Sequence, residues 1–504
     1  MDFDKDLQSI QEVRWLVAKA VVAQKELAKM SQQQVDGIAK AIADACAAQS
    51  ERLAKMAVEE TGFGIWQDKV LKNLLGSAIT WDSVKDMKTV GIIKDDRQNG
   101  LMEVGVPMGV VAALIPSTNP TSTTMYKSII SIKAGNAIVI SPHPNAKNCI
   151  IETAKVICEA ARKAGAPEGI VQCITLPTME ATDALLKNRN IGIILATGGE
   201  AMVRAAYSSG NPALGVGPGN GPAFIEKSAN IPVAVKRIMD SKTFDNGTIC
   251  ASEQSIITER CIEQKVVDEV SRQGGYFMTP EESEKLSKFI LRANGTMNPK
   301  IVGKSAQTLA DMAGIRIPAG TRVLVSRQRT VGKDNPYSRE KLCPILAFFT
   351  VKNWEEACDK SIEILENEGT GHTMTIHSSD EEIIRQFGLR KPVSRVLVNV
   401  AAALGGVGAL TGLQPALTLG CGAVGGSASS DNIGPMNLLN IRRVAYGTME
   451  LADLRREVAQ LQTSPSGAAS CSQPQHKPCG EAELTKNQIE EITKEVLRSI
   501  LANR

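Results

Sequence analysis

Residues 109–140 read GVVAALIPSTNPTSTTMYKSIISIKAGNAIVI, in which two apolar runs flank a stretch with helix-like spacing. Short apolar runs bounded by turn residues are typical of buried strands, and the spacing at 121–134 predicts a helix between them. Neighbouring parallel strands need a crossover connection of this kind. The segment therefore predicts a parallel sheet in an α/β fold.

The alternation of strand-like and helix-like segments continues along the chain. Amphipathic stretches at 147–164 and 199–209 separate further apolar runs at 170–176 and 191–197, which predicts one doubly wound domain. A second α/β domain is predicted from another series of apolar runs: 222–226, 252–259, 322–326, 345–351, 372–378 and 394–400.

Two segments outside these series predict a small β arm. Residues 88–109 alternate around a polar Asp-Arg-Gln-Asn-Gly turn, as a hairpin does, and residues 440–447 have the pattern of a late strand. We expect the hairpin and the late strand to pair and to serve assembly.

Composition narrows the class of protein. The chain has 504 residues, which is more than one ordinary core accommodates, and its net charge of +3 gives no field that would attract nucleic acid or a membrane surface. The start MDFDKDLQSIQE is acidic and lacks the apolar core of a secretory signal, and no apolar run approaches the ~18 residues of a membrane span. We expect a cytoplasmic protein whose eleven cysteines are mostly reduced thiols.

The C-terminal part of the chain changes abruptly in character. Residues 463–480 are rich in Pro, Ser, Gly and Gln, which predicts a flexible linker. Beyond the linker, residues 484–502 carry Thr485 and Gln488 as a capping box and have apolar residues at helical spacing, which predicts an amphipathic helix. This helix could fold back on its own domain or dock on another protein.

One cysteine lies in an unusual place. Residues 243–254, TFDNGTICASEQ, form a polar turn with a glycine that delivers Cys250 just before a strand-like run. Such a turn can offer backbone N–H groups to a thiolate and to a developing oxyanion, although a core cysteine is the simpler alternative.

Four other cysteines fall in apolar patterns that predict burial: Cys46, Cys158, Cys173 and Cys358. Residues Cys471, His476 and Cys479 in the linker are a weak metal-site pattern, and no metal site is predicted.

Three glycine clusters invite a nucleotide-binding interpretation. The segment GCGAVG at 420–425 matches a dinucleotide fingerprint but is followed by neither a helix nor a crossover, so a structural loop is expected. The cluster ATGGEAM at 196–202 follows a strand and opens a helix, so Gly198 and Gly199 could let the backbone approach a phosphate. The cluster GVGPGNGP at 215–222 is expected to follow a helix.

Four motifs, taken together and in order, resemble the aldehyde dehydrogenase family, and specifically its coenzyme-A-acylating acetaldehyde and propionaldehyde dehydrogenases. They are residues 115–147, ATGGEAMV, FDNGTICASEQ and EKLCPIL at 340–346. The resemblance covers about residues 10 to 450. It implies a domain that binds NAD and coenzyme A (1–90 and 109–222), a catalytic domain (223–431), and an oligomerisation arm (91–108 and 432–450) that forms a homodimer or a dimer-of-dimers tetramer.

The resemblance also implies a reaction. Cys250 would attack a short aliphatic aldehyde, hydride would pass from the thiohemiacetal to NAD, and coenzyme A (CoA) would take the acyl group from the resulting thioester. The hydrolytic branch of the family carries a glutamate base where this chain has Val216, which cannot take a proton from water. A hydrolytic dehydrogenase, a phosphate-dependent acyl reductase and a non-catalytic scaffold remain alternatives.

The resemblance assigns roles to individual residues. His372 would take the proton of CoA or orient the substrate, unless it is only structural. Thr118 stands where the hydrolytic branch has its oxyanion-binding asparagine, and Asn119 follows it, so either side chain could assist Cys250. A loosely held nucleotide is implied because ISPHP lacks the usual lysine and glutamate. The implied cofactor-binding residues are Ser117, Ser141, Pro142, His143, Thr197, Gly198, Gly199 and Glu340.

The tail adds a second resemblance. A C-terminal amphipathic helix behind a flexible linker is similar to the encapsulation peptides that carry enzymes into bacterial microcompartments. It implies that residues 484–502 dock on shell or cargo proteins and that the enzyme resides inside such a compartment.

Overall fold

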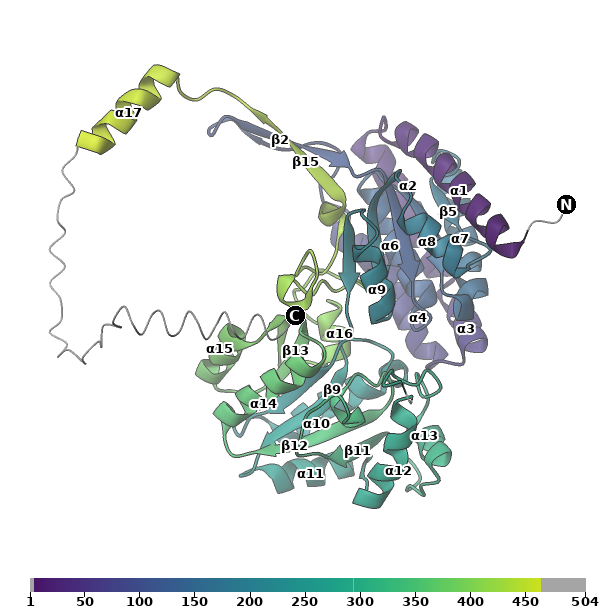
Figure 1. Ribbon diagram of the computed structural model, residues 1–504, viewed down its shortest axis with the longest axis vertical. Coiled ribbons are helices and arrows are strands. Elements are labelled where there is room, and N and C mark those ends of the chain that lie inside the picture. The colour runs from purple at the N-terminus through teal and green to yellow at the C-terminus, as the bar shows by residue number, and fades with distance from the viewer. Residues whose placement is uncertain (1–3, 293, 464–504) are drawn as a thin grey trace, which may run out of the picture. The chain divides into compact units, whose positions relative to one another are not determined.

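The computed structural model of the chain describes residues 4–292 and 294–463 (Figure 1). It divides into two compact units, of which the first runs to Ala445 and the second begins at Tyr446. The helix α17 (Leu451–Thr463) belongs to the second unit and was not predicted from the sequence. Apart from Thr463, the predicted linker at 463–480 lies outside the described residues, as does the predicted helix at 484–502.

A five-stranded parallel sheet forms the first α/β domain. Its strands run in the order β5-β4-β3-β6-β7, so the chain starts in the middle and winds outward in both directions. The strands are β3 (Val110–Ile115), β4 (Ala137–Pro142), β5 (Val171–Cys173), β6 (Ile191–Thr197) and β7 (Ala213–Val216). This order confirms the predicted doubly wound topology.

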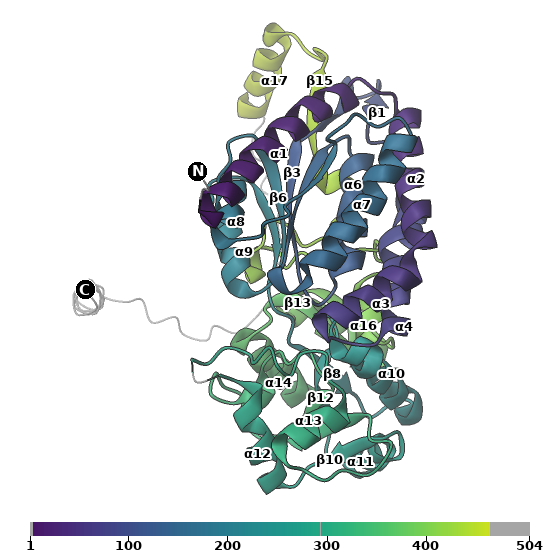
Figure 2. The same ribbon diagram turned by 90° about the vertical axis from the view of Figure 1, so that its right-hand side faces the viewer.

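Helices cover both faces of this sheet. Figure 2 shows α6 and α7 on one side of the sheet and α8 and α9 on the other. The crossovers are α6 (Pro120–Lys133), α7 (Lys147–Lys163), α8 (Met179–Leu186) and α9 (Glu200–Tyr207), of which only α8 was not predicted. The N-terminal helices are α1 (Lys5–Leu27), α2 (Gln32–Ala48), α3 (Ser50–Thr61), α4 (Trp66–Leu74) and α5 (Thr80–Val84).

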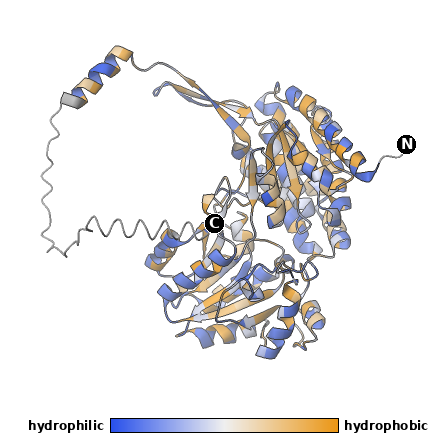
Figure 3. Cartoon of the chain, viewed as in Figure 1, coloured by the Kyte–Doolittle hydropathy of each residue, from blue (hydrophilic) through white to orange (hydrophobic). Residues whose placement is uncertain are grey.

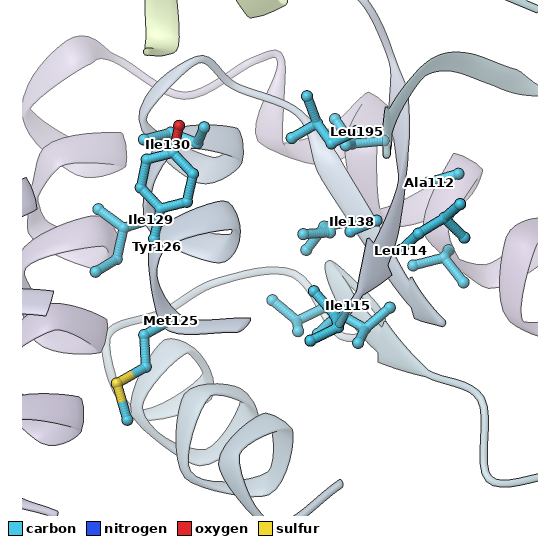
Figure 4. Close-up of a cluster of buried hydrophobic side chains, with 14 of the residues drawn as sticks. Ala112, Leu114, Ile115, Met125, Tyr126, Ile129, Ile130, Ile138 and Leu195 are labelled. Atoms are coloured by element: carbon cyan, nitrogen blue, oxygen red, sulfur yellow. The ribbon is translucent and has the colours of Figure 1, made fainter. Parts of the chain in front are cut away.

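Residues 109–140 lie at the centre of this domain. Every residue of β3 is buried, because the strand pairs with β4 on one side and β6 on the other. Figure 4 shows side chains of β3, such as Leu114 and Ile115, in one cluster with Tyr126 and Ile130 of α6. Fully buried parallel strands of this kind appear in sequence as continuous apolar runs, which is why the pattern was readable.

A seven-stranded parallel sheet forms the second α/β domain, in the order β10-β11-β12-β9-β8-β13-β14. The strands are β8 (Gly221–Ile225), β9 (Glu253–Glu259), β10 (Gly275–Phe277), β11 (Val323–Arg327), β12 (Ile345–Val351), β13 (Gly371–His377) and β14 (Val393–Val398). Its helices are α10 (Ile231–Thr243), α11 (Glu263–Arg272), α12 (Pro280–Ile290), α13 (Ala306–Ala313), α14 (Trp354–Asn367), α15 (Glu381–Arg390) and α16 (Ala402–Gly406). The strands of both sheets consist mainly of hydrophobic residues, and the helices around them are amphipathic (Figure 3).

The predicted arm is a three-stranded antiparallel sheet. The hairpin of β1 (Gly91–Asp96) and β2 (Leu101–Pro107) adds β15 (Leu439–Ala445) along β2. A Cβ at Gly105 would come within 2.5 Å of the Thr89 carbonyl oxygen, so the arm leaves its domain through a contact that only glycine permits. The pairing of hairpin and late strand is confirmed, and its role in assembly stays a prediction.

Of the two glycine clusters outside the first sheet's crossovers, one was predicted wrongly and one correctly. The cluster at 215–222 does not follow a helix but spans the end of β7 and the start of β8, because a short apolar run such as that of β7 cannot be told from a helix by pattern alone. The segment 420–425 is a loop with one 3₁₀ turn (Ala423–Gly425), as expected. Among the described residues no helix is both long and apolar enough to cross a bilayer.

Burial of the first sheet gives a direct test of the packing. Leu195 of β6 is fully buried, whereas Leu389 of α15 is 70% exposed. Leu195→Ala should destabilise the protein by about 2–5 kcal/mol, because it removes transfer free energy and leaves a cavity. Leu389→Ala, the matched control, should change stability by less than about 0.5 kcal/mol. Chemical denaturation of both variants measures the difference, and equal effects would contradict the packing described here.

Candidate active site

The turn that carries Cys250 has a constrained backbone. Asp245 and Asn246 adopt φ values of 49° and 50°, in the left-handed region that non-glycine residues rarely occupy. They lie in a 3₁₀ turn (Phe244–Gly247) between α10 and the Cys250 segment. Such a conformation persists only where surrounding contacts hold it. The contacts of Asp245 therefore determine where the turn lies.

Asp245 is fully buried and is paired with two buried lysines of α4. Lys69 Nζ lies 2.9 Å from Asp245 Oδ2, and Lys72 Nζ contacts the same oxygen. The backbone N–H of Ile65 donates to Asp245 Oδ1 at 2.7 Å. Burial alone would raise the pKa of Asp245, but the two lysines hold it below its usual value. We call Asp245, Lys69 and Lys72 the lysine–aspartate cluster; it ties the turn to α4.

The cluster also positions Asn119. Lys72 Nζ donates to Asn119 Oδ1 at 2.7 Å and to Thr248 Oγ1 at 2.9 Å. The amide nitrogen of Asn119 donates to the Thr248 carbonyl at 3.1 Å and to Thr118 Oγ1 at 3.3 Å. The structure thus brings both predicted oxyanion residues to the turn, two residues before Cys250. Of the two, Asn119 is the one that bonds the turn directly.

Cys250 is partly buried and lies against a glycine of the connection between the two sheets. A Cβ at Gly219 would come within 1.9 Å of the Cys250 carbonyl oxygen and 3.3 Å of His372 Cε1. Only glycine fits there, and the Cys250 carbonyl and the His372 ring both lie on the face of Gly219 that a side chain would occupy. Burial, and secondarily the charge of Glu340, raises the pKa of the Cys250 thiol to about 12, while Arg395 lowers it. The thiol therefore needs activation before it can act as a nucleophile.

His372 lies in β13 and is fully buried. Its Nδ1 lies 2.9 Å from Thr373 Oγ1, and its Nε2 has no hydrogen-bond partner among residues 4–292 and 294–463. Burial, with a further contribution from Arg395, lowers the pKa of His372 to about 3. The imidazole is consequently neutral at physiological pH, with one ring nitrogen left for a ligand.

Glu340 meets the same glycine from another side. The backbone N–H of Gly219 donates to Glu340 Oε1 at 2.9 Å, and the N–H of Glu340 donates to Glu368 Oε2 at 2.6 Å. Burial first, and the neighbouring Glu368 second, raises the pKa of Glu340 to about 8. Glu340 is therefore mostly protonated near neutral pH.

The other predicted cofactor residues gather where strands of the first sheet end. Ser117 follows β3, and Ser141 and Pro142 end β4, with His143 next in the chain. Because parallel strands end at one edge, these residues lie along the same edge of the sheet as the end of β6. Their side chains make few contacts; Thr197 Oγ1, for example, lies 3.2 Å from Thr418 Oγ1.

A cavity lies between the start of α9 and Glu340. It has a volume of about 660 Å³ and is lined by Gly199, Arg204, Pro218, Arg339, Glu340 and Glu368, among others. Gly198 and Gly199 precede α9, and a Cβ at Gly199 would meet nothing within 4 Å. The backbone at the start of α9 is thus open to a ligand, as its glycines predicted.

Sequence reasoning missed several residues of the site. Lys69, Lys72 and Arg395 were not singled out, because a charged residue in a helix or strand usually indicates a solvated face. The isolated charge in SRVLVNV (394–400) was the one available signal for Arg395. Two cysteines predicted as buried, Cys158 and Cys173, are partly exposed, because Cys173 ends β5 at the sheet edge and Cys158 packs beside it on α7.

Comparison with known proteins identifies relatives. The model of the aldehyde dehydrogenase family matches residues 7–275. An aldehyde-alcohol dehydrogenase of Clostridium acetobutylicum is 44% identical over 428 residues, which are 84% of this chain and 49% of that protein. The chain thus spans about half the length of such curated relatives.

Solved structures cover the chain more fully. A probable aldehyde dehydrogenase from Listeria monocytogenes is 64% identical, with a TM-score of 0.89 over 90% of this chain and 100% of that one. An acetylating aldehyde dehydrogenase from Geobacillus thermoglucosidasius is 52% identical, with a TM-score of 0.87 over 89% and 99% of the two chains. A propionaldehyde dehydrogenase from a fucose-utilisation microcompartment of Clostridium phytofermentans is 28% identical, with a TM-score of 0.78 over 87% and 98%.

The raised pKa of Glu340 predicts a pH dependence of stability. The folded protein holds this proton up to about pH 8, whereas the unfolded chain loses it near 4.5. Because the unfolded state binds fewer protons in this range, Glu340 makes stability fall as pH rises from about 5 to about 8. Glu340→Gln keeps the acceptor for Gly219 and should flatten this decline in thermal unfolding. Glu381→Gln at an exposed site is the control, and parallel pH profiles for wild type and Glu340→Gln would contradict the assignment.

Proposed function

The chain belongs to the aldehyde dehydrogenase family, and on this premise we propose that it is a CoA-acylating aldehyde dehydrogenase. It oxidises a short aliphatic aldehyde, of the acetaldehyde and propionaldehyde class, to the acyl-CoA and reduces NAD, and it runs in both directions. The observation that carries the proposal is the position of Cys250. It lies on a turn that buried charges hold in place, and it shares a contact at Gly219 with His372, whose Nε2 is free for a ligand among the described residues. Position 216 is Val216, which cannot accept a proton.

The residues present fit a nicotinamide dinucleotide. The open backbone at Gly199, the 660 Å³ cavity that extends to Glu340, and the polar side chains at the ends of β3, β4 and β6 suit phosphates and riboses. Ser117, Ser141, Pro142, His143 and Thr197, with Gly198, would line its path, and Glu340 would meet the ribose beside the nicotinamide. Bound NAD would supply the hydride acceptor, and CoA would supply the thiol that receives the acyl group.

The residues of the chain divide the chemistry among them. Cys250 sulfur adds to the aldehyde carbon, and the backbone near Cys250, with the Thr118 hydroxyl that Asn119 positions, holds the oxygen. The lysine–aspartate cluster keeps the turn in place, so the nucleophile keeps its position during both halves of the reaction. After hydride loss the acyl group remains on Cys250 as a thioester.

The fate of the thioester decides between acylation and hydrolysis. Val216 is buried at the end of β7 and has no group that could activate water. Glu340 is bonded to Gly219 and mostly protonated at neutral pH, so it is a poor proton acceptor. A thioester without a base for water persists until a thiol attacks it.

Replacement of Cys250 tests the assignment. Cys250→Ala should abolish NADH formation from propionaldehyde and NAD, because no thiohemiacetal can form. Cys261→Ala removes an exposed thiol and should retain full activity. Wild type should turn over repeatedly only when CoA is present, as followed by absorbance of NADH. Multiple turnover to the free acid without CoA would contradict the acylating assignment.

The arm and the tail support a proposal about assembly. The three-stranded arm presents the edges of β1 and β15, which suits a homodimer or a dimer-of-dimers tetramer. The apolar spacing at 484–502 suits an encapsulation helix that docks on shell or cargo proteins of a bacterial microcompartment in the cytoplasm. The likeness to a microcompartment propionaldehyde dehydrogenase supports this placement.

Removal of residues 464–504 tests the role of the tail. The shortened enzyme should keep the CoA-dependent activity of the full chain, since the described site lies before Tyr446. Co-sedimentation with purified microcompartment shells should be lost. If the shortened enzyme loses both its activity and its co-sedimentation with shells, or if it still co-sediments, the tail is not an independent encapsulation segment.

A further inference from the structure

Arg395 carries a buried charge without a carboxylate partner. The residue lies in β14, is 4% exposed, and takes part in none of the ion pairs of the described residues. Its Nη2 donates to the Gly420 carbonyl at 2.7 Å, and its Nη1 donates to the Ser430 carbonyl and Asn432 Oδ1, both at 3.2 Å. A buried cation held only by neutral acceptors is costly. Its location beside the site suggests a purpose other than stability.

The third nitrogen of the Arg395 guanidinium, Nε, reaches the neighbour of His372. Thr373 and Arg395 are register partners across β13 and β14, and Arg395 Nε donates to Thr373 Oγ1 at 3.2 Å. The other contact of this hydroxyl is His372 Nδ1, at 2.9 Å. One oxygen therefore lies between a permanent donor and the imidazole.

Hydrogen-bond accounting settles the direction of the second bond. A guanidinium only donates, so Thr373 Oγ1 accepts from Arg395 and has a single hydrogen to give. If His372 Nδ1 also donated, that hydrogen would have no acceptor within bonding distance among the described residues. If the hydroxyl donates to Nδ1, the hydroxyl hydrogen and Nδ1 are both satisfied, and only Nε2 is left for a ligand. The neutral ring then carries its proton on Nε2.

We propose that Arg395 and Thr373 are positioning residues that fix His372 as a hydrogen-bond donor through Nε2, so that His372 holds the acyl oxygen on Cys250 and does not take the proton of CoA. The proposal rests on the acylating function proposed above. Nε2 is buried and unpartnered, and its ring carbon Cε1 lies against Gly219, whose other neighbour is the Cys250 peptide. A ligand oxygen on Cys250 would meet this donor.

The assignment changes how the acyl group is released. CoA reacts as its thiolate: its sulfur forms a bond to the thioester carbon, and the electron pair of the C=O bond moves to the oxygen held by His372. Collapse of this adduct breaks the bond to Cys250 sulfur and expels the Cys250 thiolate. No proton moves in this step, so no base is needed. A lowered pKa of about 3 likewise makes His372 a weak proton acceptor.

The tautomer can be observed without any cofactor or substrate. The chain has four histidines, so ¹⁵N-histidine labelling gives few signals, and His372→Gln identifies those of His372. We expect Nδ1 of His372 to show the shift of an unprotonated acceptor nitrogen and Nε2 that of an N–H. Thr373→Val should alter this pattern, whereas Thr373→Ser should retain it. An N–H at Nδ1 in the wild type would overturn the proposal.

Replacing His372 by an amide side chain shows whether it acts in turnover as a hydrogen-bond donor or as a base. The glutamine amide reaches about as far as Nε2, and the asparagine amide about as far as Nδ1, and neither can act as a base. His372→Gln should keep CoA-dependent turnover within about tenfold of wild type, while His372→Asn should lose about 100-fold, as loss of one oxyanion donor does. Equal losses in both variants would overturn the donor role.

Variants of the two positioning residues complete the test. Thr373→Val should slow acyl transfer to CoA more than the first round of NADH formation, and Thr373→Ser should leave both close to wild type. Equal melting temperatures of these two variants exclude misfolding as the cause. If the wild type makes no acyl-CoA at all, the proposed function fails, yet the ¹⁵N measurement still decides the tautomer. Equal slowing of both steps would overturn the positioning role.

Discussion

The lysine–aspartate cluster is the interaction on which the arrangement of the site depends. One buried carboxylate, Asp245, receives two ammonium groups from α4, and through Lys72 it also holds Asn119 at the start of α6. Three segments far apart in sequence thus meet at one charge. Removal of a single partner from such a buried group leaves an uncompensated ion, which costs several kcal/mol. The strained φ values of Asp245 and Asn246 are tolerable because this cluster holds them.

The sequence predicted the frame of the molecule well, for a physical reason. Buried parallel strands are continuous apolar runs, so β3, β4, β6 and the six longer strands of the second sheet were found. The family resemblance is confirmed by the family match and by relatives of known structure. Short elements such as β7 and β10 were missed because three or four residues carry too little pattern.

The candidate site was predictable only in part. Cys250 was indicated by its turn, and His372 and Glu340 by resemblance, and the structure places all three around Gly219. The roles of Lys72 and Arg395 could not be predicted, because each depends on a partner that is distant in sequence. Lys72 contacts Asp245, 173 positions away, and Arg395 contacts Thr373, 22 positions away. A charge that is buried and paired looks the same in a sequence as one that is solvated. Tertiary structure alone distinguishes the two.

Burial acts on the ionisable groups of the site in one direction, toward neutrality. It raises the pKa of Cys250 to about 12 and that of Glu340 to about 8, and it lowers the pKa of His372 to about 3. Arg395 is the exception among them, because a guanidinium keeps its proton at any physiological pH. A fixed positive charge next to these groups favours whichever ligand or side chain becomes negative. In a thiol enzyme those species are the Cys250 thiolate and the oxyanion of its adducts, so the cost of burying Arg395 is offset where negative charge develops during the reaction.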